Sequence, residues 1–122
     1  MIQVEGPRRV CGIHVLRRDN LVYPGGKMSF TKSVATSITG TVTVDAQIVS
    51  AAVGFNVTQT YTVTDEQTVT ISPNYSRAEV SAYANYDIWQ YDIYKKRIFW
   101  DSKEGYGSVS KPVGVCFNIV YS

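Results

Sequence analysis

The chain has 122 residues and a formal net charge of +2, and 44% of its residues are hydrophobic. This hydrophobic content excludes a disordered chain, the length fits one domain over residues 1–122, and the small charge argues against a nucleic-acid partner. No apolar run approaches the roughly 18 residues that a membrane-spanning helix needs.

The first 23 residues predict short strands separated by turns. Ile2–Val4 alternates apolar and polar side chains before Gly6-Pro7, and Val10–Leu16 alternates again. Four arginines bracket the second of these strands: Arg8, Arg9, Arg17 and Arg18. The simpler interpretation is that these arginines are solvated strand ends, which prevent edge-to-edge pairing. The alternative is that they form an anion-binding patch.

The stretch from Ser29 to Ser72 carries the strongest pattern, in which apolar residues alternate with Ser and Thr. Apolar side chains occupy mainly even positions up to Ile48 and odd positions from Val49 onward. Because side chains on a strand point to alternate faces, such a change of phase requires a turn or a bulge. We predict a long hairpin whose apex lies within Asp45–Ala52, with a bulge in one bent strand as the alternative.

The second long alternating segment is Arg77–Tyr94. Its apolar phase changes at Ile88-Trp89 without any turn residue, which predicts a β-bulge. The remaining residues predict a turn or strand end at Lys95–Arg97, a short strand at Ile98–Trp100, a loop at Asp101–Gly107 and a last strand at Val113–Tyr121. The whole pattern predicts an all-β fold, an antiparallel β-sandwich with a long Ser/Thr-rich hairpin.

Two cysteines, Cys11 and Cys116, lie near opposite ends of the sequence. The first and last strands of a β-domain can be neighbours, so a disulfide is geometrically reasonable, and two buried thiols are the alternative. The first residues do not resemble a signal peptide. The paired cysteines and the Ser/Thr/Tyr-rich strands nevertheless favour export, and we expect a secreted protein in its mature form.

No motif indicates catalysis, a metal or a cofactor. His14 is the only histidine, and its phase places it opposite Ile13 and Val15, at the surface of a strand. Catalysis through it would require an oriented partner within hydrogen-bond reach. Asp87 and Asp92 share one segment, but the predicted bulge leaves their relative facing open. We expect a protein that is not an enzyme and holds no cofactor.

An aromatic cluster suggests a binding surface. Tyr and Trp combine a large stacking area with a polar group, as glycan and protein interfaces need. Cross-strand aromatic pairs that stabilise the sheet are the alternative interpretation. The candidate binding aromatics are Tyr83, Tyr86, Trp89, Tyr91, Tyr94 and Trp100.

The run Asn56–Thr64, then Thr68–Ile71 with Pro73, then Arg77–Tyr94 resembles the stem and following strands of aerolysin-like β-pore-forming toxins, the epsilon-toxin branch included. The resemblance implies Ser/Thr-alternating strands that rearrange into a membrane-inserted hairpin in an oligomer. Val34–Val44 and Val53–Val63 each supply the 9–11 residues that a membrane strand needs. The candidate membrane residues are Val34, Ile38, Val42, Val44, Ile48, Val49, Val53, Phe55, Val57, Tyr61 and Val63.

The sequence thus predicts a secreted, non-enzymatic β-sandwich that resembles the membrane-inserting module of these toxins. Its expected partners are a lipid membrane or a cell-surface glycan, together with further copies of itself, and not nucleic acid. The alternative is a glycan- or protein-binding module that uses the aromatic-rich surface.

Overall fold

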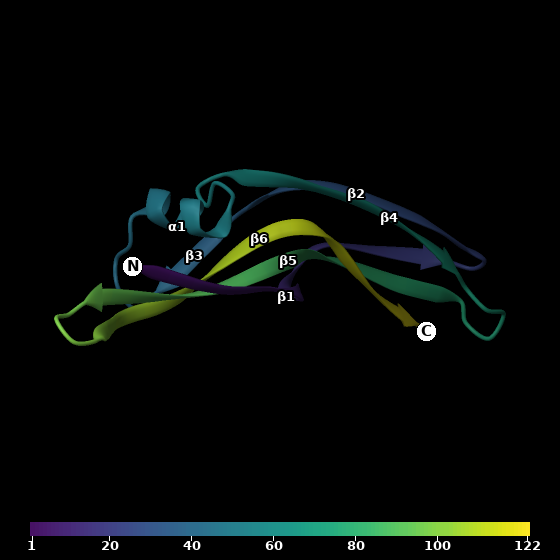
Figure 1. The fold of residues 1–122 in the computed structure, drawn as a ribbon. Helices are drawn as coiled ribbons and strands as arrows, with labels where there is room; N and C mark the ends of the chain where they lie inside the picture. The colour runs from purple at the N-terminus through teal and green to yellow at the C-terminus, as the bar shows by residue number, and fades with distance from the viewer.

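The computed structural model describes residues 1–122, which form six strands and one short helix (Figure 1). In chain order these are β1 (Ile2–Val22), β2 (Gly25–Ala35), β3 (Ser37–Gly40), α1 (Ala46–Val53), β4 (Thr60–Thr70), β5 (Arg77–Lys96) and β6 (Asp101–Tyr121). Apart from the helix, every element is a strand, as the alternating sequence predicts.

The strands form two antiparallel sheets. The larger sheet has the order β1-β5-β6-β3, and the smaller sheet pairs β2 with β4. Figure 1 shows β2, β4 and α1 on one side of the larger sheet. The predicted all-β fold, with two antiparallel sheets packed as a sandwich, is therefore confirmed.

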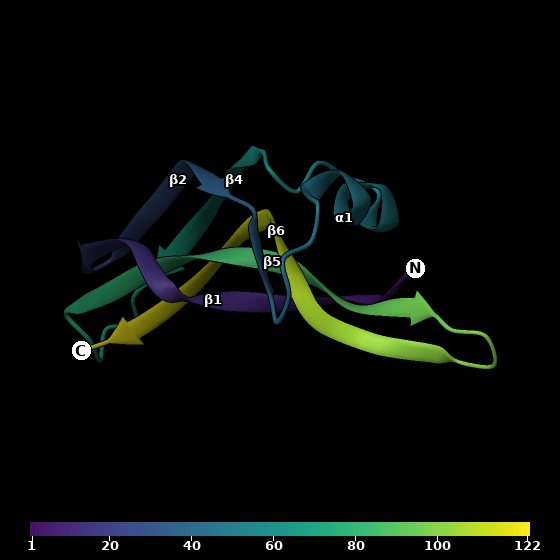
Figure 2. The same cartoon turned by 90° about the vertical axis from the view of Figure 1, so that its left-hand side faces the viewer.

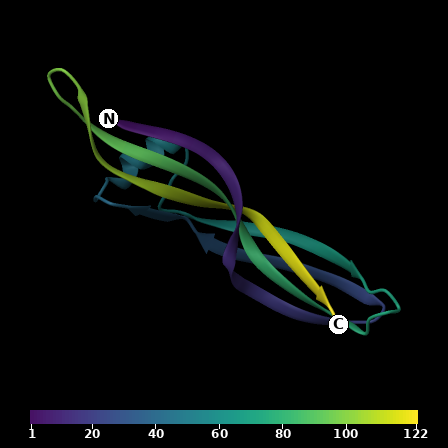
Figure 3. The ribbon, with the colours of Figure 1, turned by 90° about the horizontal axis from the view of Figure 1, so that it is seen from below.

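The molecule is long and strongly twisted. Strands β1, β5 and β6 have 20 or 21 residues each, which corresponds to roughly 65–70 Å at full extension. The accessible surface is 7770 Å², whereas a globular protein of this mass exposes about 6,600 Å². Seen from below, the long strands coil around one another along the molecular axis (Figure 3).

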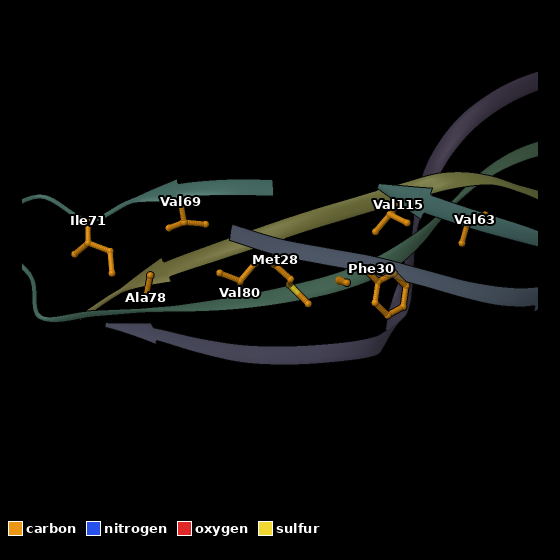
Figure 4. Close-up of a cluster of buried hydrophobic side chains, with 9 residues drawn as sticks. Met28, Phe30, Val63, Val69, Ile71, Ala78, Val80 and Val115 are labelled. Atoms are coloured by element: carbon orange, nitrogen blue, oxygen red, sulfur yellow. The ribbon is translucent and has the colours of Figure 1, made fainter. Parts of the chain in front are cut away.

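The main core lies between the small sheet and one half of the large sheet (Figure 4). Even positions of β2 and odd positions of β4 point inward, while Ser and Thr face outward, as the alternation predicts. On the outer face the hydroxyl oxygens of Thr31 and Thr64 lie 3.0 Å apart. The buried members are Met28, Phe30, Val63, Val69, Ile71, Ala78, Val80, Ala82 and Val115.

A second core lies beneath α1, over the other half of the large sheet. Val49 of the helix is fully buried there with Tyr91 of β5 and Val109 of β6. The buried hydrophobic residues of β5 therefore lie at even positions from Ala78 to Ala84 and at the odd position Tyr91 further on. This is the change of phase that the sequence shows at Ile88-Trp89.

A register shift lies close to the bulge predicted in β5. Glu5 pairs with Gln90 and Arg8 pairs with Ile88, so two residues of β1 face one residue of β5. The extra residue thus belongs to β1, because Gly6-Pro7 interrupts the regular pairing there. Strand β1 itself continues from Ile2 to Val22 through these irregularities instead of forming separate short strands.

The predicted hairpin apex within Asp45–Ala52 is wrong, because residues 46–53 form helix α1. The side chain of Asp45 accepts a hydrogen bond of 2.7 Å from the Gln47 N–H and caps the helix start. Gly54 ends it in the left-handed conformation that glycine adopts without strain. The two arms of the ribbon still pair, since β2 and β4 are antiparallel over their whole length.

A disulfide joins Cys11 to Cys116, with 6.0 Å between the two Cα atoms. It connects β1 to β6, the two strands that flank β5. It lies beside the register break of β1 between Cys11 and Val15. The first of the two interpretations of the cysteines is therefore correct.

Candidate functional site

The hairpin that connects β5 to β6 ends in an exposed apolar turn. The Arg97 N–H donates a 2.8 Å hydrogen bond to the Trp100 carbonyl, which closes a four-residue turn. The exposed fraction is 90% for Ile98, 88% for Phe99 and 64% for Trp100. Figures 1 and 2 show this turn projecting from one end of the molecule, beyond α1 and β3. We call residues 95–100 the hairpin tip.

The composition of this turn is unusual. Tight turns favour Gly, Pro, Asn, Asp and Ser, which suit the backbone and interact with water. Here Ile98 and Phe99 occupy the two central positions, where neither can pack against the rest of the chain. Residues that break a local sequence preference in this way are expected at functional positions.

The short strand predicted at Ile98–Trp100 is therefore wrong. Strand β5 extends to Lys96, the turn occupies residues 97–100, and β6 begins at Asp101, inside the predicted loop. Three successive large apolar residues resemble a buried strand when they are read locally. The missing alternation, directly after three basic residues, is the signal that distinguishes them.

Basic residues surround the apolar turn, and some of them are paired. Arg97 forms an ion pair of 3.2 Å with Glu104, and Lys103 forms one of 2.9 Å with Asp92. The hydrogen bond to Asp92 raises the pKa of Lys103. Lys95 and Lys96 are exposed and belong to no ion pair in the structure. Asp101 lies directly across the strand pair from Lys96, whereas Ser102 lies across from Lys95. The tip thus presents three apolar side chains beside two exposed lysines.

A polar groove lies further along the same hairpin, on the face of the large sheet opposite α1. Its volume is about 860 Å³. Alternation along the strands produces this face, because Ile2, Val4 and Ile93 pack toward α1 and their neighbours point away. The side chains on the groove face are Gln3, Glu5, Thr39, Thr41, Gln90, Asp92, Lys103, Tyr106 and Ser108.

Strand register arranges these side chains in two rows. Across the first row, Gln3 pairs with Asp92 and Asp92 pairs with Tyr106. Across the second row, Glu5 pairs with Gln90, Gln90 with Ser108 and Ser108 with Thr39. Direct cross-strand neighbours have Cβ atoms about 4.5–5.5 Å apart. The sheet therefore presents a regular array of carboxylate, carboxamide and hydroxyl groups.

Tyr91 supports this groove from the opposite side of the sheet. It is 3% exposed, and its hydroxyl donates a 3.1 Å hydrogen bond to the Thr39 carbonyl. Burial raises its pKa above the usual value of 10.0. The ring crosses the paired glycines Gly40 and Gly107, where any side chain would overlap it. Both glycines are thus required for Tyr91 to hold β3 against β6.

The predicted aromatic surface does not form as one patch. Tyr91 is buried, so its assignment to a binding face is wrong, and only Trp100 of the set is largely exposed. Trp89 is half-buried against Phe55, with ring centroids 4.9 Å apart. The other members, Tyr83, Tyr86 and Tyr94, are half-buried along β5 at positions of both parities. Most of this cluster stabilises the sheet.

The predicted membrane segment is also divided by the fold. Val49, Val57 and Val63 are buried in the two cores. Val34, Val44, Val53, Phe55 and Tyr61 are half-buried, while Ile38, Val42 and Ile48 are exposed by 39–54%. Residues 41–59 contain no strand, so Val34–Val44 and Val53–Val63 are not continuous strands in this state.

The residues considered for catalysis lie apart. His14 is exposed on β1, Asp87 forms an ion pair of 3.0 Å with Arg9, and Asp92 is paired with Lys103. No group of three or more His, Cys, Asp or Glu side chains is placed to hold a metal ion. The one helix, with eight residues, is too short to cross a membrane.

Residues 23–119 match a family that is described as a family of unknown function, DUF6426. The matched region contains β2 to β5, nearly all of β6 and the hairpin tip, and it contains the groove residues other than those on β1. No curated protein matches the chain.

Proposed function

The chain belongs to the DUF6426 family, and we propose that it is a non-enzymatic protein that docks on anionic lipid membranes through its hairpin tip. The observation that carries this proposal is the exposed Ile98-Phe99-Trp100 turn beside Lys95 and Lys96. Exposed apolar residues with neighbouring cations are typical of segments that lie in the membrane interface. Trp in particular favours the headgroup region.

The shape of the tip favours a bilayer over a protein partner. A protein would need a concave pocket to receive a projecting turn, whereas a bilayer accommodates it without a preformed site. The unpaired Lys95 and Lys96 lie at the base of the turn, where they can meet anionic headgroups while the apolar side chains enter the interface.

The expected affinity follows from the side chains involved. Burying one large apolar side chain contributes about 1.5–3 kcal/mol, and each cation near an anionic surface about 1 kcal/mol. Three apolar residues inserted in part and two lysines therefore give about 4–8 kcal/mol. This range corresponds to dissociation constants from about 1 mM to about 1 μM. Docking is weak and reversible, and an oligomer would strengthen it through multivalency.

Insertion of residues 34–63, as the resemblance to pore-forming toxins implies, would be a further step in this proposal. It requires α1 to unfold and Val49, Val57 and Val63 to leave the two cores. The tip needs no such rearrangement, because its apolar groups are already exposed. Dye release from vesicles measures this second step separately from docking.

The disulfide supports an extracellular setting for this function. Disulfides persist in oxidising compartments and are rare in the cytosol. Cys11 and Cys116 join the first and last strands of the chain. Secretion is thus part of the proposal, and an outer membrane surface is the place where the tip would act.

The test is sedimentation with vesicles of phosphatidylcholine alone or with about one third phosphatidylglycerol. We expect the parent protein to bind the anionic vesicles and its tryptophan emission to shift to shorter wavelength. Ile98→Ser should weaken binding about tenfold or more, because one deep apolar contact is lost. The Lys95→Gln, Lys96→Gln double variant should remove most of the preference for anionic lipid.

Ile13 offers a matched control for this experiment. It is 86% exposed on β1, compared with 90% for Ile98, but it lies far from the tip. Ile13→Ser therefore makes the same chemical change at another exposed position and should leave binding within twofold. Absence of binding by the parent protein, or equal losses for the two variants, would refute docking through the tip.

A further inference from the structure

The polar groove on β1, β5, β6 and β3 has the chemistry of a second binding site, distinct from the hairpin tip. Gln3, Glu5 and Gln90 point into it, and their side chains make no hydrogen bond within the chain. Carboxamides both donate and accept hydrogen bonds, and carboxylates accept up to four. Such groups, fixed at regular cross-strand spacing, are suited to a ligand with many hydroxyl groups.

Tyr106 supplies the apolar component of the site. Tyr106 is 58% exposed, and the Lys103 ammonium lies 5.2 Å from the centroid of its ring. Lys103 is in turn held by Asp92 at 2.9 Å. The Lys103 ammonium thus lies over one face of the ring, and the C–H face of a sugar ring can stack on the aromatic surface that stays exposed.

The charges of the groove argue against an anionic ligand. The charged side chains that line it are Glu5, Asp92 and Lys103, which sum to a formal charge of −1. The only cation is already paired with Asp92, so no positive charge is available for a phosphate or a carboxylate. The groove thus disfavours an anion, and its uncharged carboxamide and hydroxyl groups suit a neutral ligand that is rich in hydroxyl groups.

We propose that this groove binds a neutral oligosaccharide, which stacks one sugar ring on Tyr106 and offers hydroxyl groups to Gln90, Glu5 and Gln3. Thr39 and Ser108, whose hydroxyl oxygens lie 3.0 Å apart, form the far end of the second row. Because the groove is on the large sheet, its strands hold these groups without help from a mobile loop. The site is complete in a single chain.

The groove lies at a suitable distance from the tip for a surface glycan. Tyr106 lies six positions after Trp100, which is roughly 20 Å along an extended strand. A protein docked by its tip would thus hold the groove outside the headgroup layer. The sugar site itself does not depend on docking, and it is tested without any membrane.

The experiment begins with an array of neutral and sialylated oligosaccharides, followed by calorimetric titration. The titrated probes are trisaccharides of glucose, galactose, mannose and N-acetylglucosamine, with sialyllactose as the acidic comparison. We expect at least one neutral trisaccharide to bind with a millimolar or lower dissociation constant. Sialyllactose should bind at least tenfold more weakly.

Tyr106→Ala should weaken binding of that trisaccharide tenfold or more, and Gln90→Ala should weaken it severalfold. Tyr23→Ala is the matched control, because Tyr23 is 51% exposed but lies in the turn between β1 and β2 and does not line the groove. Both tyrosines are surface residues, so circular dichroism should show all variants folded. Failure of every neutral sugar to bind, preference for sialyllactose, or equal effects of Tyr106→Ala and Tyr23→Ala would each overturn the proposal.

Discussion

Adding one methyl group at Gly107 should destabilise the protein far more than adding one at Gly114. Both glycines lie on β6, and neither has a positive φ, so the backbone accepts alanine at either position. A Cβ at Gly107 would overlap the Thr39 carbonyl and the Tyr91 hydroxyl. A Cβ at Gly114 would meet nothing closer than the Asn85 Cβ at 4.0 Å. Comparing the two alanine variants therefore isolates the steric effect of the added methyl group.

The size of the effect follows from what must move. Overpacking a well-filled site costs about 1–3 kcal/mol. Displacing Tyr91 also breaks its hydrogen bond to Thr39 and leaves a buried hydroxyl unpaired, which costs about 1–3 kcal/mol. Replacing glycine regains about 0.4–1 kcal/mol through the unfolded chain. We expect Gly107→Ala to cost about 3 kcal/mol, and Gly114→Ala to be neutral or to stabilise by up to about 1 kcal/mol.

The assay is urea unfolding followed by circular dichroism, with the disulfide intact, supported by thermal melting. A loss of about 3 kcal/mol corresponds to a fall in Tm of about 10 °C for a chain of this size. The midpoint should change while the urea dependence stays constant. If the two variants differ by less than about 0.5 kcal/mol, Tyr91 does not cover Gly107, and the account of how β3 is held would be refuted.

The Cys11–Cys116 disulfide joins residues 105 positions apart. Its reduction should remove up to about 4.7 kcal/mol of stability on the chain-entropy model. Urea unfolding with and without dithiothreitol measures this loss, and a value below about 1 kcal/mol would contradict the prediction. Because burial raises the pKa of Tyr91, the folded state keeps the neutral phenol after the unfolded chain begins to ionise. The contribution of the neutral Tyr91 phenol to the stability of the fold is thus complete below about pH 10 and is lost as the pH rises through the folded-state pKa. Tyr91→Phe should flatten the fall in stability above pH 10, and an unchanged alkaline profile would argue against this assignment.

The sequence predicts most of β2, β4 and β5 correctly, because each buries one face against a partner and exposes the other. Met28 and Phe30 on β2, and Val63 and Val69 on β4, point inward at the predicted positions. Alternation also indicates the change of phase near Ile88-Trp89. These features depend on the local period of the strand, which the amino-acid order contains.

The sequence contains the capping signals of helix α1, but the prediction of a hairpin apex within Asp45–Ala52 overlooks them. The β-branched residues before and after it extend the two-residue rhythm across Asp45–Gly54, and that rhythm obscured the capping signals. Asp45 at the start, Gly54 at the end and Ala51-Ala52 between them are the features of a short helix. Tertiary packing of Val49 against Tyr91 and Val109 stabilises it, as a helix this short requires.

The candidate sites also combine features that the sequence predicts with features that depend on the folded structure. The all-β class and the inward and outward faces of the main strands follow from the sequence, because the side-chain period is a local property. For Cys11 and Cys116 the sequence left a disulfide and two buried thiols as alternatives, and the fold brings the two residues together. The exposed turn at Ile98–Trp100 depends on the local hairpin of β5 and β6, and the missing alternation indicates it in the sequence. The sequence does not show that Gln3, Gln90 and Tyr106 share one groove. The groove depends on the pairing of β1 and β6 with β5, which joins residues as far apart in the chain as Ile2 and Ile93. Register at that range is a property of the folded sheet.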